Sequence, residues 1–86
     1  MKLSYSDYFK KRLKKRIDKN PQLRQKVSKQ LKLLVQNIHH PSLKTHKLKG
    51  SRKTEYAVWL EGDLRITFVV IGEGLLLTDI ITHDEY

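Results

Sequence analysis

The chain has no cysteine, only two prolines, and no apolar run long enough to cross a membrane as a helix. Without cysteine, disulfides, thiolate catalysis and thiolate zinc sites are excluded. A transmembrane helix needs roughly 20 consecutive apolar residues, and the opening MKLSYSDYFKK also lacks the apolar region of a signal peptide. These absences predict a protein of the cytoplasm that has no membrane partner.

The composition is that of one folded domain. The chain has 86 residues, of which 38% are hydrophobic and 31% are charged, which is too apolar for a disordered tail. A chain of this length buries too little surface to support a second independent core. We therefore expect a single domain over residues 1–86.

Acidic residues are nearly missing from the first part of the chain. Residues 1–53 hold 17 of the 18 lysines and arginines but only two acidic residues, a net charge of +15. Residues 54–86 hold one arginine and seven acidic residues, a net charge of −6. A basic field of this strength attracts polyanions, which are nucleic acid, an anionic membrane surface or an acidic protein. Charge of this kind favours nucleic acid.

Two helices are predicted in the basic part. Phe9, Leu13 and Ile17 recur every four residues, which indicates one apolar helix face, and Ser4 or Ser6 can cap this helix. Asn20 and Pro21 are expected to end it and to provide the N-cap and first position of a second helix. The second helix has an apolar stripe formed by Leu23, Val27, Leu31, Leu34 and Ile38.

From residue 54 the pattern becomes that of strands. The segments TEYAVWL, LRITFVVI and LLLTDIIT are rich in β-branched and aromatic residues and are separated by residues 61–63 and 72–74. They predict an antiparallel three-stranded meander with three-residue turns. MKLSY is compatible with a short first strand, and residues 46–49 with another inside the basic loop 41–53. The fold class is therefore α+β, with a basic N-terminal α-helical hairpin packed on a small antiparallel β-sheet.

Arg65 is the only basic residue in the acidic part and lies within an apolar strand. Three-residue turns would pair it with Trp59 on one side and Ile81 on the other. The same register would place Thr67, Asp79 and His83 on its face of the sheet and Asp63 opposite His83. Two interpretations of Arg65 remain open, namely an ion pair with Asp79 at the edge of the core and a role in binding phosphate.

Sequence motifs limit the chemistry that this face can perform. The chain has no glycine-rich phosphate loop and no cluster of ligands spaced to hold a metal, so no cofactor is expected. Hydrolysis of a phosphodiester without a metal favours RNA, because RNA supplies its own 2′-hydroxyl nucleophile. A base, an acid and a cation are then needed, and His46, Asp63, Arg65 and His83 are a sufficient set.

RNA binding is predicted for the basic loop and for two aromatic residues. The loop cations are Lys47, Lys49, Arg52 and Lys53. Trp59 and Tyr86 could stack on unpaired bases beside them. For these two residues the structural alternatives are a core tryptophan and an unstructured chain end.

The sequence resembles the RelE/ParE superfamily of bacterial toxins and, within it, the YafQ-like mRNA interferases. The resemblance covers essentially the whole chain and is sharpest in H-x-L-x-G at residues 46–50, G-D-x-R at residues 62–65 and the terminal Thr-His pair. It implies a ribosome-dependent endoribonuclease that cuts mRNA and leaves a 2′,3′-cyclic phosphate. By position, His46, Asp63 and His83 match acid–base residues of these enzymes, and Arg65 matches their transition-state arginine.

The resemblance also implies partners. These are a cognate antitoxin whose acidic segment blocks the active site, mRNA and ribosomal RNA, and operon DNA that is bound only through the antitoxin complex. Two alternatives remain, a ParE-like toxin that inhibits DNA gyrase without catalytic residues and an inactive partner that only co-represses its operon. The joint presence of His46, Asp63 and His83 favours the nuclease.

Overall fold

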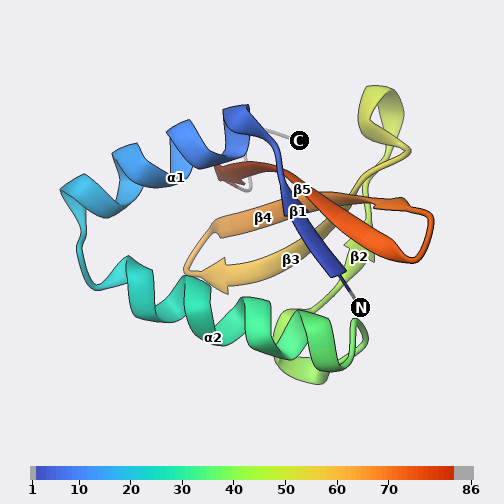
Figure 1. Cartoon of the computed structure of the whole chain (residues 1–86), viewed down its shortest axis with the longest axis horizontal. Helices are drawn as coiled ribbons and strands as arrows, with labels where there is room; N and C mark the ends of the chain where they lie inside the picture. Colours follow the sequence, from blue (N-terminus) through green and yellow to red (C-terminus); the bar gives the residue numbers. More distant parts are fainter. Residues whose placement is uncertain (1, 83–86) are drawn as a thin grey trace.

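The computed structural model of the chain describes residues 2–82 and has the predicted α+β class. Its elements are β1 (Lys2–Tyr5), α1 (Asp7–Lys19), α2 (Leu23–Gln36), β2 (His46–Lys47), β3 (Tyr56–Glu61), β4 (Leu64–Ile71) and β5 (Gly74–Thr82). Two 3-10 turns, Pro41–Leu43 and Gly50–Arg52, lie on either side of β2. Figure 1 shows that α1 and α2 form a hairpin beside the sheet and that the loop after β2 projects from the opposite end.

The sheet has five strands in the order β1-β5-β4-β3-β2. Its centre is the predicted antiparallel meander of β3, β4 and β5, and β2 adds antiparallel to β3. β1 pairs with β5 in parallel, so the sheet is mostly rather than wholly antiparallel. A parallel pair needs a long crossover, and the whole chain between β1 and β5, including the helical hairpin, provides it here.

The helix boundaries differ from the prediction at the hairpin turn. Ser6 caps α1, because its side chain accepts a hydrogen bond from the Phe9 N–H at 3.0 Å. Asn20 does not cap α2, since its own N–H donates to the Arg16 carbonyl at 2.9 Å and so closes α1. Asn20 and Pro21 therefore form a turn, and α2 begins at Leu23.

The second helix is also shorter than its apolar stripe. It ends at Gln36, because Asn37 is extended and donates its N–H to the Leu33 carbonyl at 2.8 Å. Ile38 lies beyond the helix but still packs against the core. Neither helix of the described chain has both the length and the apolar character needed to cross a membrane.

Both helices bury their apolar faces against one face of the sheet. Phe9 of α1 meets the stripe of α2 and the inward side chains of the strands, and most of these are almost fully buried, with partly buried residues such as Leu31 and Tyr56 around them. The largest members of this core are Phe9, Leu23, Leu34, Leu43, Leu60, Ile66, Phe68, Leu77 and Ile80. We call this side the helix face and the opposite side the second face.

The two hairpin turns are shorter than predicted, but the register of Arg65 is as predicted. Glu61 pairs with Leu64 and Ile71 pairs with Gly74, so each turn has two residues and starts with a glycine at positive φ. One extra residue in each hairpin, Leu60 and Thr78, is accommodated as a bulge. The bulges offset the shorter turns, and Arg65 therefore lies opposite Trp59 and Ile81.

Candidate functional site

The second face brings together residues from the meander and the basic loop. Directly paired residues of an antiparallel ladder share a face, so each ladder row projects its side chains to one side. The first row is His46, Ala57, Thr67 and Asp79, and the next is Trp59, Arg65 and Ile81. The predicted placement of Arg65, Thr67, Asp79 and Ile81 on one face is thereby confirmed.

Arg65 and Trp59 both bind the turn between β3 and β4. Trp59 Nε1 donates to the Gly62 carbonyl at 2.9 Å, and Arg65 Nη1 donates to the same oxygen at 3.1 Å. Arg65 Nη1 also donates to the Leu64 carbonyl at 3.1 Å. The guanidinium is thus directed toward the turn, where Asp63 is the exposed second residue. Of the two interpretations of Arg65, the ion pair with Asp79 is wrong, because the Asp79 carboxylate pairs with two other arginines.

Trp59 is not part of the core, which lies on the helix face of the sheet. Its side chain is half-buried on the second face, with Lys44 Nζ 5.1 Å from the ring centroid. On the helix side, the buried Gln30 donates to the Trp59 carbonyl at 2.7 Å and to the Ser42 carbonyl at 3.3 Å. These contacts fix the strand and the residue 41–43 turn together, and they leave part of the indole accessible.

His46 lies on β2 at the edge of the sheet and is exposed. Its Nδ1 is 3.1 Å from the Lys44 carbonyl, a contact that orients the imidazole. His46 and Arg65 are two strands and two residues apart in the ladder, which corresponds to about 12 Å between their Cα atoms. Side chains of their length can reach a common group placed between them.

The other predicted site residues fall into three groups. Lys47, Lys49 and Lys53 are exposed along β2 and its loop. Arg52 is mostly buried in ion pairs. His83 and Tyr86, together with the predicted pairing of Asp63 with His83, lie outside the described residues.

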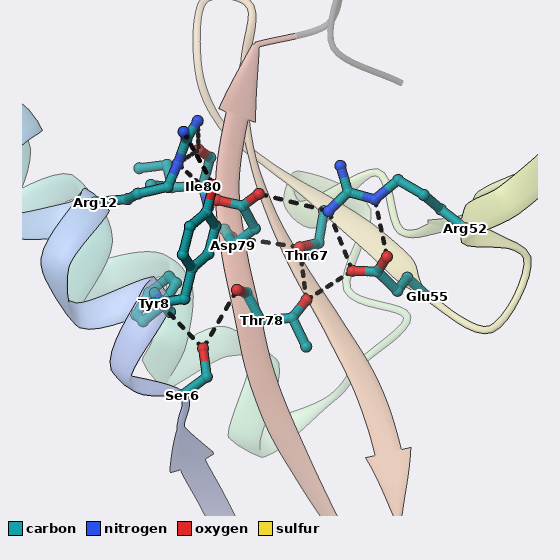
Figure 2. A network of polar contacts seen from close by, with 10 residues as sticks. Ser6, Tyr8, Arg12, Arg52, Glu55, Thr67, Thr78, Asp79 and Ile80 are labelled. Carbon is teal, nitrogen blue, oxygen red and sulfur yellow. Dashed lines mark hydrogen bonds and ion pairs between the residues drawn. The ribbon is translucent and has the colours of Figure 1, made fainter.

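A network of charges and hydroxyls surrounds Asp79 (Figure 2). Arg12 of α1 approaches from the β5 edge, with Nε 2.8 Å from Asp79 Oδ1 and Nη2 donating to the Ile80 carbonyl at 3.0 Å. Arg52 approaches from the loop and lies 2.8 Å from Glu55 and 3.5 Å from Asp79. This part of β5 lies beyond its pairing with β1, so the Ile80 carbonyl would otherwise be unpaired at the strand edge. Arg12 donates a hydrogen bond to it.

The bulge at Thr78 allows two consecutive residues of β5 to join this network. Thr78 Oγ1 donates to Glu55 Oε1 at 2.7 Å and lies 2.7 Å from Thr67 Oγ1. Asp79, the next residue, keeps its ladder position opposite Thr67. A regular strand would point these two side chains to opposite faces, whereas a bulge redirects one of them.

The network shifts the pKa values of Glu55 and Arg52. Burial raises the pKa of the Glu55 carboxyl, but the hydrogen bonds from Arg52 and Thr78 outweigh it, and the net pKa is lowered. The hydrogen bond to Glu55 raises the pKa of Arg52 against the effect of burial, with Asp79 adding to the rise. Both groups are therefore charged over the whole physiological range.

Three members of this network have little signal in the amino-acid pattern. Asp79 was noticeable as a lone charge inside an apolar strand, but its partners were not. Arg12 adjoins the apolar stripe of α1, a position that many surface arginines share. Glu55 stands beside the basic loop, and only its spacing of three residues from Arg52 could have suggested the pair. Within residues 2–82, no three His, Asp or Glu side chains gather in a way that could hold a metal ion.

Several solved structures of bacterial toxins have the same fold. YafQ from Escherichia coli strain BL21(DE3) superposes with a TM-score of 0.79 at 22% identity, covering 98% of this chain and 94% of YafQ. The YoeB/ParE toxin from Agrobacterium tumefaciens gives a TM-score of 0.80 at 15% identity, covering 96% of this chain and 99% of that toxin. The YoeB–YefM complex from Staphylococcus aureus gives 0.78 at 18% identity, covering 96% and 97%.

Comparison of sequences alone does not relate the chain to these proteins. No protein-family model matches the chain, and no curated protein matches it. At identities of this size the structural likeness concerns the backbone arrangement, which here extends over nearly the full length of both chains. The chain therefore has the fold of the YafQ and YoeB/ParE toxins, as the resemblance to the RelE/ParE superfamily predicted.

Proposed function

We propose that this protein is the toxin of a type II toxin–antitoxin system and acts as an endoribonuclease that cleaves mRNA on the ribosome without a metal ion. The observation that supports it most is the second face. There His46 and Arg65 lie in adjacent ladder rows, with Asp63 in the adjoining turn and Trp59 beside them, in a fold shared with YafQ and YoeB. The second face thus presents one histidine, one carboxylate, one guanidinium and one stacking surface.

The proposed reaction is a transesterification within the RNA. A base removes the proton of the 2′-hydroxyl, whose oxygen attacks the adjacent phosphorus while the bond to the 5′-oxygen breaks. An acid protonates the departing 5′-oxygen, so the products are a 2′,3′-cyclic phosphate and a 5′-hydroxyl. His46 and His83 are assigned to proton transfer with help from Asp63, and Arg65 to the charge on the pentavalent phosphate.

The charge distribution supports an antitoxin as the second partner. Residues 1–53 have a net charge of +15, and YafQ and YoeB have been crystallised with DinJ and YefM respectively. An acidic segment would be drawn to the same basic surface that meets RNA. We expect the association rate of the antitoxin to fall as salt is raised, because screening shortens the range of the attraction. A rate that does not change with salt contradicts electrostatic steering.

The test uses a message with one chemical change. The wild-type chain is added to ribosomes that carry a defined mRNA, and the new RNA ends are mapped. The experiment is then repeated with a single 2′-deoxynucleotide at the mapped site. We expect cleavage with a cyclic phosphate end in the first case and none at that site in the second. Equal cleavage of both messages excludes attack by the 2′-hydroxyl.

A second candidate function is inhibition of DNA gyrase, which the fold shared with the YoeB/ParE toxin also permits. The two functions can be distinguished by the first response of cells that express this protein without an antitoxin. A nuclease stops translation and leaves cut messages on ribosomes, whereas a gyrase inhibitor first induces DNA damage responses. Growth that continues unchanged excludes both and favours a protein that only co-represses its operon.

A further inference from the structure

Arg52 fastens the loop between β2 and β3 to the second face by one edge of its guanidinium. Nε donates to Glu55 Oε2 at 2.8 Å, and Nη2 donates to Glu55 Oε1 at 3.3 Å and lies 3.5 Å from Asp79 Oδ2. The other terminal nitrogen points away from both carboxylates in Figure 2. Within residues 2–82 that nitrogen makes no hydrogen bond or ion pair.

Each carboxylate that holds Arg52 is itself held by other groups. Glu55 Oε1 accepts from Thr78 at 2.7 Å. Asp79 Oδ1 accepts from the Ile80 N–H at 2.7 Å and lies 2.8 Å from Arg12 Nε. The side chains of Arg52, Glu55 and Asp79 are only 25%, 16% and 11% exposed. The guanidinium is thus confined to one orientation before any ligand arrives.

The location of Arg52 suggests more than attachment of a loop. Asp79 already has Arg12 as a closer partner, so it does not need Arg52 for neutralisation. Asp79 belongs to the ladder row of His46, one row from Arg65, and Arg52 reaches it from the loop that follows β2. The remaining terminal nitrogen carries two N–H donors, and a charged guanidinium N–H forms strong hydrogen bonds with phosphate oxygens.

We propose that Arg52 binds a phosphate of the RNA backbone on the second face, and that Glu55 and Asp79 are positioning residues that hold its guanidinium in place for it. This rests on the proposed function. Holding the side chain in advance removes the rotamer entropy that a free arginine would lose on binding. The same phosphate contact supplied by an exposed lysine would lack this advantage.

Binding of an uncleavable RNA tests the contact. The probe is a single-stranded oligonucleotide with 2′-O-methyl groups throughout, and its Kd is measured over a range of salt concentrations. Arg52→Gln is expected to weaken binding and to reduce the slope of log K against log salt by about 0.7, the value for one lost phosphate contact on a single strand. The control is Lys2→Gln, which removes an exposed charge from β1 at the opposite edge of the sheet and should leave the slope unchanged.

Turnover on ribosomes tests the positioning. Glu55→Gln leaves Arg52 charged, so the salt slope should stay at the wild-type value while kcat falls about tenfold. Arg52→Lys should behave in the same way, because it keeps the charge and loses the fixed planar geometry. All rates are measured at a temperature where circular dichroism shows the variant to be fully folded, which also covers an Arg52→Gln variant that is unstable.

The outcomes separate this inference from the proposed function. If wild-type protein cleaves messages but Arg52→Gln keeps the wild-type salt slope and loses only stability, Arg52 is a structural clamp and the inference is wrong. An unchanged kcat in Glu55→Gln removes the positioning role. If the wild-type protein neither binds the probe nor cleaves RNA, the proposed function fails and the inference fails with it.

Discussion

The two faces of this sheet are built from different interactions. The helix face is mostly apolar, and residues such as Ile66, Phe68 and Leu77 are fully buried there against the two helices. The second face also buries residues completely, Ala57 and Thr67 among them, but its contacts are hydrogen bonds and ion pairs to loops and to the edge of α1.

This difference predicts how each face responds to substitution. Dispersion and burial on the helix face are shared among many contacts and respond to the volume of a side chain. On the second face a few charged side chains each have one or two defined partners. A substitution there changes the orientation and the charge of these side chains more than their packing. Loss of stability should therefore dominate on the helix face, and loss of activity on the second face.

The largest effect is expected for Phe68→Ala on the helix face. Phe68 is fully buried and stacks on Tyr56 with 5.5 Å between the ring centroids. Truncation removes the buried ring and leaves a cavity, which costs about 3–5 kcal/mol of the free energy of unfolding. Urea unfolding followed by circular dichroism measures this loss. A midpoint within error of the wild type would contradict the assigned core.

Arg65→Ala on the second face should show the opposite response. We expect cleavage on ribosomes to fall at least about a hundredfold, since the cation assigned to the transition-state charge is removed. The free energy of unfolding should fall by only about 1 kcal/mol, because the lost hydrogen bonds go to carbonyls near the surface turn. Full cleavage activity, or unfolding as large as in Phe68→Ala, would remove the distinction between the faces.

The helix face could be predicted from the sequence because its pattern is periodic. Intervals of four residues place Phe9 and Val27 inward, and alternation along the strands places Val58 and Ile66 against them. The register of Arg65 was also predictable, although the turns were not. Each hairpin exchanges one predicted turn residue for a bulge, and these two errors cancel in the pairing.

The second face could not be predicted to the same depth. The partner of Asp79 depends on the path of the loop that contains Arg52 and on the approach of α1, and neither has a periodic signal. The assignment of Asn20 failed for a related reason, since one residue can either end a helix or begin the next. Local patterns leave such choices open, and long-range contacts decide them.

Acid should weaken the second face selectively through Glu55. Its pKa is lowered in the folded protein, because hydrogen bonds from Arg52 and Thr78 outweigh the opposing effect of burial. A lowered folded pKa gives stability that is fully present above the ordinary value of 4.5 and is lost as the pH falls through the folded pKa. We expect Glu55→Gln to lose about 1–3 kcal/mol at pH 7 and to show a flatter fall in stability below pH 4.5 than the wild type. Parallel pH profiles for the two proteins would mean that Glu55 is not coupled to folding.

The smallest expected effect is at Ser6, where the two faces are joined. Its hydroxyl accepts from the Phe9 N–H at 3.0 Å as the cap of α1 and donates to the Thr78 carbonyl at 3.3 Å in the bulge of the second face. Ser6→Ala removes both bonds and should cost about 1 kcal/mol in thermal or urea unfolding.

Ser6→Asp keeps the cap acceptor but has no proton for Thr78, so it separates the two contributions. If capping is the main role, Ser6→Asp restores most of the lost stability, because aspartate is also favoured at a helix N-terminus. If Ser6→Asp is as unstable as Ser6→Ala, the bond to the bulge is the more important one, and the cap and the second face are coupled through this residue.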